Sequence, residues 1–207
     1  MGKGVFDLGS YEEKEAYFQK VLSDVKQHIY RYTGSAERYF LFGIKKVVLS
    51  SPAWSRFQIL KKQFPYISNH DFPALLEDQF IFFQDEQLKE RLCNKYLEGT
   101  VSYGTSEYHY ILGSLLGFPP NAVHFFSTGK ADQEPKKRIT IRFCGVECVG
   151  SVEDLVNDVI WLWENYPYPD MDILTLNYNC ECADIQYGDI SRVIDVQKRI
   201  LSHISAV

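Results

Sequence analysis

The chain has 207 residues, of which 45% are hydrophobic, 15% aromatic and 24% charged, and its formal net charge is −5 at pH 7. These values are typical of a globular protein and exclude a disordered, fibrous or low-complexity chain. The acidic balance argues against general nucleic-acid binding, because proteins of that class usually carry a basic surplus. No stretch is long and apolar enough to cross a bilayer, so we expect no membrane partner.

The spacing of apolar residues predicts that residues 1–127 form a mainly helical subdomain. Ser10–Glu13 (SYEE) matches a capping box and begins a first helix, which Thr33 and Gly34 end. Further helices are predicted over 36–49, over 51–65 and, as one broken helix or two, over 72–97.

The clearest helical pattern lies just before Gly117. Apolar residues recur there at positions i, i+3, i+4, i+7 and i+8, which predicts one buried helix face. These residues are Tyr108, Ile111, Leu112, Leu115 and Leu116. Gly117 is expected to end this helix, and Pro119 and Pro120 to open a short one that runs through Phe126.

Residues 112–126 (LGSLLGFPPNAVHFF) resemble a short element of a family of uncharacterised prokaryotic proteins. A Cys-Cys pair often follows the proline in that family, but Asn121 and Ala122 hold those places here. The resemblance therefore implies no thiol chemistry and no activity. It implies a structural elbow, with Gly117 at a positive φ and Pro120 at the start of the next helix.

Residues 127–137 (STGKADQEPKK) are polar and rich in turn formers, and we place a boundary there. Residues 128–207 then predict a small α/β subdomain with the order β-(β)-α-β-α, whose strand–helix–strand order predicts a parallel pair with a right-handed crossover. The predicted fold class is α+β, with the helical part packed on this layer in one cooperative unit.

Cysteine spacing raises the question of a metal site. Cys144 and Cys148 precede Cys180 and Cys182, and four thiolates are a common zinc ligand set. However, Leu174, Leu176, Tyr178, Cys180 and Cys182 alternate with polar residues, which predicts a half-buried strand with both cysteines on its apolar face. We therefore predict no cofactor and keep a four-cysteine zinc site as the alternative.

A cluster of ring side chains provides the second candidate site. Tyr103, Tyr108, His109 and Tyr110 lie close together in the sequence and are the predicted pocket residues. Lys136, Lys137, Arg138 and Arg142 form the basic run of the chain, which we interpret as the solvated start of a strand.

No P-loop, dinucleotide-binding, zinc-protease or hydrolase motif occurs in the sequence. We therefore expect a cytoplasmic binding or regulatory protein without catalysis, acting through a protein or small-molecule contact. The chain lacks a signal-peptide pattern and has an odd number of cysteines, which favours reduced thiols. The alternative is a metalloprotein or enzyme. The sequence leaves open whether the chain forms a homo-oligomer.

Overall fold

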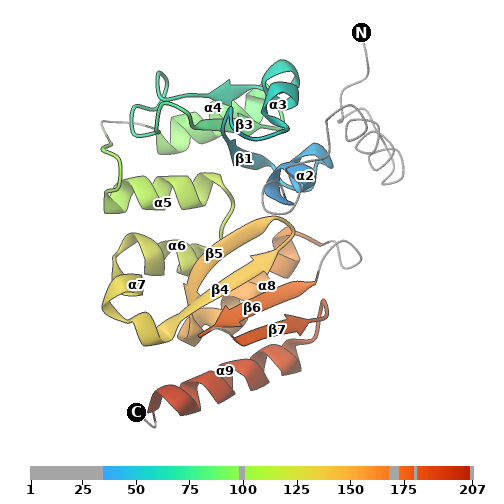
Figure 1. Ribbon diagram of the computed structural model, residues 1–207, viewed down its shortest axis with the longest axis vertical. Helices are drawn as coiled ribbons and strands as arrows, with labels where there is room; N and C mark the ends of the chain where they lie inside the picture. Colours follow the sequence, from blue (N-terminus) through green and yellow to red (C-terminus); the bar gives the residue numbers. More distant parts are fainter. Residues whose placement is uncertain (1–34, 98–100, 168–172, 180, 206–207) are drawn as a thin grey trace. The chain divides into compact units, whose positions relative to one another are not determined.

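The computed structural model describes residues 35–97, 101–167, 173–179 and 181–205, and it has the predicted α+β fold class (Figure 1). The chain divides into two compact units between Tyr103 and Gly104. The boundary predicted at 127–137 lies within the second unit, and cooperative unfolding of the whole chain stays a prediction. The helix predicted from Ser10 to Thr33 lies outside the described residues.

The first unit combines short helices with a three-stranded antiparallel sheet of order β1-β3-β2. Its elements are α2 (Ser35–Leu41), β1 (Val47–Ser50), α3 (Phe57–Gln63), β2 (Tyr66–Ile67), β3 (Phe80–Phe83) and α4 (Glu86–Tyr96). The Asp85 side chain accepts a hydrogen bond from the Leu88 N–H and thereby caps α4.

The single helix predicted over 36–49 is wrong, because that region contains β1. In 72–97, predicted as one broken helix or two, the second half forms α4 but the first half contains the strand β3. Gly43 adopts φ +75°, which stops α2, and the β-branched pair Val47 and Val48 then enters β1. Residues 80–83 read Phe-Ile-Phe-Phe, and they form the central strand β3. The helix expected from Ser51 begins only at Phe57, although Pro65 follows its end as predicted.

Aromatic side chains fill much of the core of this unit. Phe40, Phe82 and Phe83 have 0% of their surface exposed, and Phe57 makes edge-on ring contacts with Phe80 and Phe82. The high aromatic content of the sequence therefore serves packing here.

A buried polar cluster links α2 to β1 and to the turn before α3. The Ser50 hydroxyl donates a hydrogen bond to the Glu37 carboxylate, and an Arg56 guanidinium nitrogen lies 3.7 Å from the other Glu37 oxygen. Burial raises the pKa of Glu37, although Ser50 and Arg56 oppose this shift.

The second unit contains a four-stranded sheet of order β5-β4-β6-β7 with antiparallel neighbours throughout. Its helices are α5 (Ser106–Leu115), α6 (Pro120–Ser127), α7 (Lys130–Gln133), α8 (Leu155–Asn165) and α9 (Ile190–Ser205), with 3-10 turns η2 (Pro135–Lys137) and η3 (Val152–Asp154). Its strands are β4 (Arg138–Phe143), β5 (Val146–Ser151), β6 (Leu174–Tyr178) and β7 (Glu181–Ile185).

The predicted parallel pairing is wrong, although the predicted element order is present. Strand β5 follows β4 through a two-residue turn and so occupies one side of β4. After α8 the chain returns to the other side of β4 as β6. Strands β5 and β6 consequently run in the same direction, but β4 lies between them.

The elbow between α5 and α6 has the predicted geometry. Gly117 adopts φ +71°, and Pro120 is the first residue of α6. The Tyr166 hydroxyl donates a hydrogen bond of 3.0 Å to the Gly117 carbonyl oxygen, which ties the elbow to the end of α8.

One face of the second sheet is apolar and the other is polar. Ile139, Ile141 and Phe143 of β4 are each at most 1% exposed, as their alternation predicts. Helix α8 lies behind the sheet in Figure 1, and α9 runs along the β7 side.

The prediction that Cys182 faces the core is wrong. Residues 174–182 do not form one strand, because the chain reverses after Tyr178, which pairs with Glu181. Two residues that pair across neighbouring strands lie on the same face of the sheet. Because the even-numbered Leu174 of β6 pairs with the odd-numbered Ile185 of β7, the core-facing positions are even in β6 and odd in β7. Ile185 is therefore buried, whereas Cys182 is exposed on the polar face. Cys180 lies outside the described residues.

Candidate binding pocket

A cavity of about 400 Å³ lies between helices α5 and α6 and the β4–β5 hairpin, and we call it the α5–β5 pocket. The Thr105 hydroxyl accepts a hydrogen bond from the Tyr108 N–H and fixes the start of α5. The elbow at Gly117 then turns the chain so that α6 packs beside α5 and against β5. The lining residues are His109, Leu112, Gly113, Phe118, Ala122, Val123, Phe126, Thr140, Glu147, Cys148 and Val149.

Gly113 allows the two helices to approach closely. A Cβ atom at this position would lie 3.0 Å from a Val123 methyl group and 3.6 Å from the Phe118 ring. This agrees with the close packing expected of a small residue on a helix face. The helix pair thus forms an apolar wall of the pocket.

His109 and Phe126 form an aromatic contact at the pocket. Their ring centroids are 5.1 Å apart with an interplanar angle of 87°, and His109 also contacts the Tyr108 ring edge-on. Phe126 is 42% exposed, so a large apolar ring stands at the mouth of the cavity. Exposed rings of this kind often mark contact surfaces.

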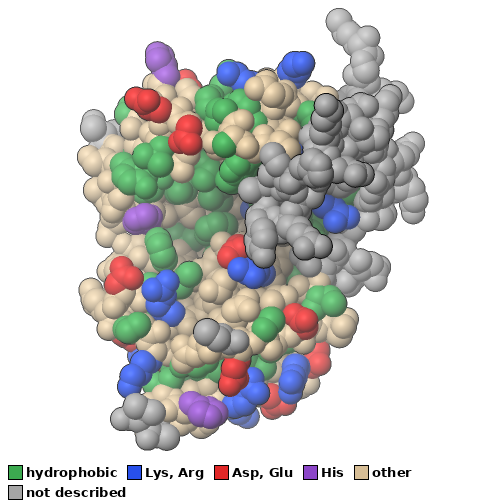
Figure 2. Space-filling model, viewed as in Figure 1, with side chains coloured by type: hydrophobic (Ala, Val, Ile, Leu, Met, Phe, Trp, Pro, Cys, Tyr) green, Lys and Arg blue, Asp and Glu red, His purple; other side chains and the backbone are tan. Residues whose placement is uncertain are grey.

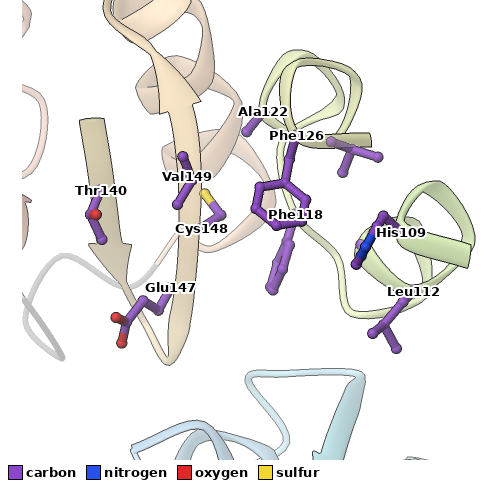
Figure 3. A pocket seen from close by; sticks show the side chains of 11 residues that line it. His109, Leu112, Phe118, Ala122, Phe126, Thr140, Glu147, Cys148 and Val149 are labelled. Atoms are coloured by element: carbon purple, nitrogen blue, oxygen red, sulfur yellow. The ribbon is translucent and has the colours of Figure 1, made fainter. Parts of the chain in front are cut away.

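Three consecutive residues of β5 form the opposite side (Figure 3). Glu147 and Val149 belong to the polar face of the sheet, and Cys148 belongs to its buried face. In Figure 3, the labelled side chains of Phe118 and Phe126 lie between Cys148 and His109. The Glu147 carboxylate accepts a hydrogen bond of 2.8 Å from the Arg142 guanidinium, so its charge is partly balanced.

The structure brings only one of the four predicted ring residues into the pocket. His109 lines it, whereas Tyr108 is 3% exposed and packs in the core. Tyr110 and Tyr103 are 50% and 59% exposed and do not line the cavity. The reason is helical spacing, since residues 108, 109 and 110 point about 100° apart around α5.

Cys148 and Cys182 do not come together. They lie on opposite edge strands, β5 and β7, with two strands between them. At a strand spacing of about 4.8 Å this separates them by roughly 14 Å, far beyond the reach of a common zinc ion. Among the described residues no three His, Cys, Asp or Glu side chains are placed to hold a metal ion.

Three residues of the basic run, Lys137, Arg138 and Arg142, are paired with nearby carboxylates. Lys137 contacts Glu134 at 2.6 Å and Glu153 at 2.8 Å, and Arg142 contacts Glu147. Figure 2 shows Lys and Arg side chains beside Asp and Glu side chains over the second unit. That the protein does not bind nucleic acid in general stays a prediction.

A buried carboxylate lies beside the first turn of α6. Asp158 of α8 is 1% exposed, and burial, together with the Asp154 carboxylate, raises its pKa to about 7. The Ala122 N–H and the Asn121 amide oppose this shift, but neither carboxylate oxygen has a well-formed hydrogen bond among the described residues. The Asp158 carboxyl is thus about half protonated near pH 7.

Another cavity, of about 260 Å³, lies between α9 and the β6–β7 hairpin. Its wall includes Lys136, Tyr178, Glu181, Arg199 and His203. Arg199 lies 3.7 Å from Glu181, so opposite charges meet inside it.

Sequence reasoning missed several residues of the α5–β5 pocket. Phe118 and Phe126 lie in the stretch that we interpreted only as an elbow. Glu147 and Val149 lie in the optional second strand of the predicted order, for which the sequence analysis named no site residues. Only the spatial approach of β5 to α5 reveals them, and no local pattern carries that information.

Comparisons with protein-family models, curated proteins and solved structures found no match. The resemblance of residues 112–126 to an uncharacterised prokaryotic family therefore stays an expectation. Among the described residues, no helix has the length and apolar character needed to cross a membrane.

Proposed function

We propose that this chain is a binding protein that holds an apolar group of its ligand in the α5–β5 pocket. The supporting observation is a cavity of about 400 Å³ with mainly apolar walls and few polar groups, His109, Thr140 and Glu147 among them. Ligand sites are typically concave, apolar and supplied with a small number of orienting polar groups. The proposal involves no chemical step.

The walls of the pocket are held in place by contacts that do not depend on a ligand. The Val123 side chain packs directly against Gly113, which has no side chain of its own. The Tyr166 hydroxyl donates a hydrogen bond to the Gly117 carbonyl oxygen and so fixes the elbow. A preformed site loses less entropy on binding than one that must first become ordered. The cytoplasmic location remains part of this proposal, supported by the absence of disulfides among the four described cysteines.

The test is a titration with the neutral apolar dye Nile red, followed by fluorescence. Leu112→Trp replaces a leucine in the pocket wall with a bulky ring and should weaken dye binding at least tenfold. Tyr110→Trp places the same ring at an exposed position of the same helix and should leave dye binding unchanged. Thermal melting checks that both variants fold. Equal dye binding by the two variants would overturn the proposal.

A further inference from the structure

The outer edge of β5 carries backbone groups that point toward the pocket. Cys144 and Gly145, with φ values of 47° and 73°, form the two-residue turn between β4 and β5. Positive φ at both turn residues is characteristic of a type I′ hairpin, in which the flanking residues form a hydrogen-bonded pair. Phe143 and Val146 are that pair.

Hydrogen-bonded and non-hydrogen-bonded pairs alternate along an antiparallel ladder. Glu147 faces Arg142 and Val149 faces Thr140, so these are non-hydrogen-bonded pairs. The N–H and C=O groups of Glu147 and Val149 consequently point away from β4. Within the part of the chain that the structure describes, no hydrogen bond to these outward groups is formed.

We infer that β5 binds an extended peptide segment, which adds to the sheet as a further strand and places an apolar side chain in the α5–β5 pocket. This inference rests on the proposed function and names the ligand class. Only a polypeptide offers N–H and C=O groups at the two-residue spacing that Glu147 and Val149 present. The apolar cavity directly beside these groups accepts a side chain of the same segment.

The chemistry of the pocket narrows the peptide further. Phe118, Phe126 and Leu112 favour an aromatic or large aliphatic side chain, because such groups bury the most apolar area. Glu147 is the carboxylate among the lining residues, so a neutral or basic residue beside it is favoured over an acidic one.

The opposite edge strand, β7, provides an internal comparison. Tyr178 and Glu181 are the pair that closes the β6–β7 hairpin, and Cys182 faces Asn177 in the next pair. Because hydrogen-bonded and non-hydrogen-bonded pairs alternate, the Cys182 N–H points outward from the sheet. Cys182 is exposed and lines neither described cavity. The β7 edge thus resembles β5 in its backbone, but Cys182, unlike Val149, lines neither described cavity.

Proline substitutions test the edge directly. Val149→Pro removes the outward N–H without removing a hydrogen bond to β4, which is the position where an edge strand tolerates proline. Cys182→Pro is the matched control on β7. Circular dichroism and thermal melting verify the fold of both variants.

The probe is a library of random heptapeptides displayed on phage and selected against the intact chain, followed by synthesis of the enriched peptides. These peptides should bind Val149→Pro at least about tenfold more weakly than the wild type and bind Cys182→Pro unchanged. Methylation of individual peptide amides should weaken binding at every second residue.

Each other outcome overturns the inference in a distinguishable way. Equal affinity for Val149→Pro and wild type, or methylation effects without alternation, excludes strand addition. Nile red binding without any enriched peptide leaves the pocket as a small-molecule site. Concentration-dependent dimerisation that Val149→Pro abolishes assigns the edge to a second copy of the chain. Failure of both dye and peptides removes the proposed function as well.

Discussion

Gly150 of β5 lies directly against Asp158 of α8. A Cβ atom at position 150 would come within 3.0 Å of Asp158 Oδ2 and 3.3 Å of the Ile141 side chain. Because Gly150 has no side chain, the buried Asp158 carboxyl has room beside the start of α6.

Asp158→Asn should change how stability depends on pH. Burial and the Asp154 carboxylate raise the pKa of Asp158 from 3.8 to about 7, whereas the unfolded chain keeps the ordinary value. Between these values the folded state retains a proton that the unfolded state releases, so the free energy of unfolding falls as pH rises through this range. The contribution is on the order of 2–4 kcal/mol.

Urea denaturation of the wild type and of Asp158→Asn at about pH 4 and about pH 8 measures this effect. The amide variant should gain stability relative to the wild type as pH rises, because it has no charge to bury. A stability difference that stays constant with pH would contradict the raised pKa.

Gly150→Ala should destabilise the chain by about 1–3 kcal/mol, because the new methyl group meets Asp158 and Ile141 at less than contact distance. The double variant with Asp158→Ala removes the carboxyl that the methyl group meets. Part of the cost should therefore disappear in the double-mutant cycle, measured by chemical denaturation. Strict additivity of the two substitutions would show that the contact does not matter.

Gly117→Ala should cost more than Gly104→Ala. Both glycines have φ above +70°, so both substitutions introduce backbone strain of about 1–2 kcal/mol. Only at Gly117 would the new Cβ also meet another group, the Tyr166 hydroxyl at 2.6 Å, which should add about 1–3 kcal/mol. Melting temperatures of the two variants test this, and similar losses would rule out the Tyr166 contact as a constraint.

Cys182 should react rapidly with a thiol reagent in the folded protein, whereas Cys144 and Cys148 should react slowly. Cys182 is exposed on the polar face of the sheet, and the other two are 0% and 6% exposed. Mass spectrometry after brief alkylation locates the modified residues, and Cys182→Ser serves as the control. Faster labelling of Cys148 than of Cys182 would refute the face assignment.

The sequence was sufficient where one periodicity persisted over a whole element. The stripe from Tyr108 to Leu116 predicted α5. In β4, the alternation of Ile139, Ile141 and Phe143 with polar residues likewise matches the buried face of the strand. Short apolar runs were ambiguous, because four residues such as Phe80–Phe83 fit a strand and a buried helix turn equally well.

Cys182 shows why an alternating pattern can mislead. The polar and apolar alternation continued through Asn179, which adopts φ 47°, but the chain had reversed there. Asparagine tolerates positive φ, and this was the available signal for a turn. The α5–β5 pocket was harder still to predict, because only tertiary packing brings Val149 and Leu112 to the same cavity.

The strand order of the second sheet has a consequence for how the chain reaches its native state. The β4–β5 and β6–β7 hairpins each connect through two residues, so each can form locally and early. The central β4–β6 ladder instead joins segments separated by β5 and α8, and its loop closure carries the larger entropic cost. We expect docking of the two hairpins on each other to limit the folding rate, with α8 as the element whose early formation shortens the search.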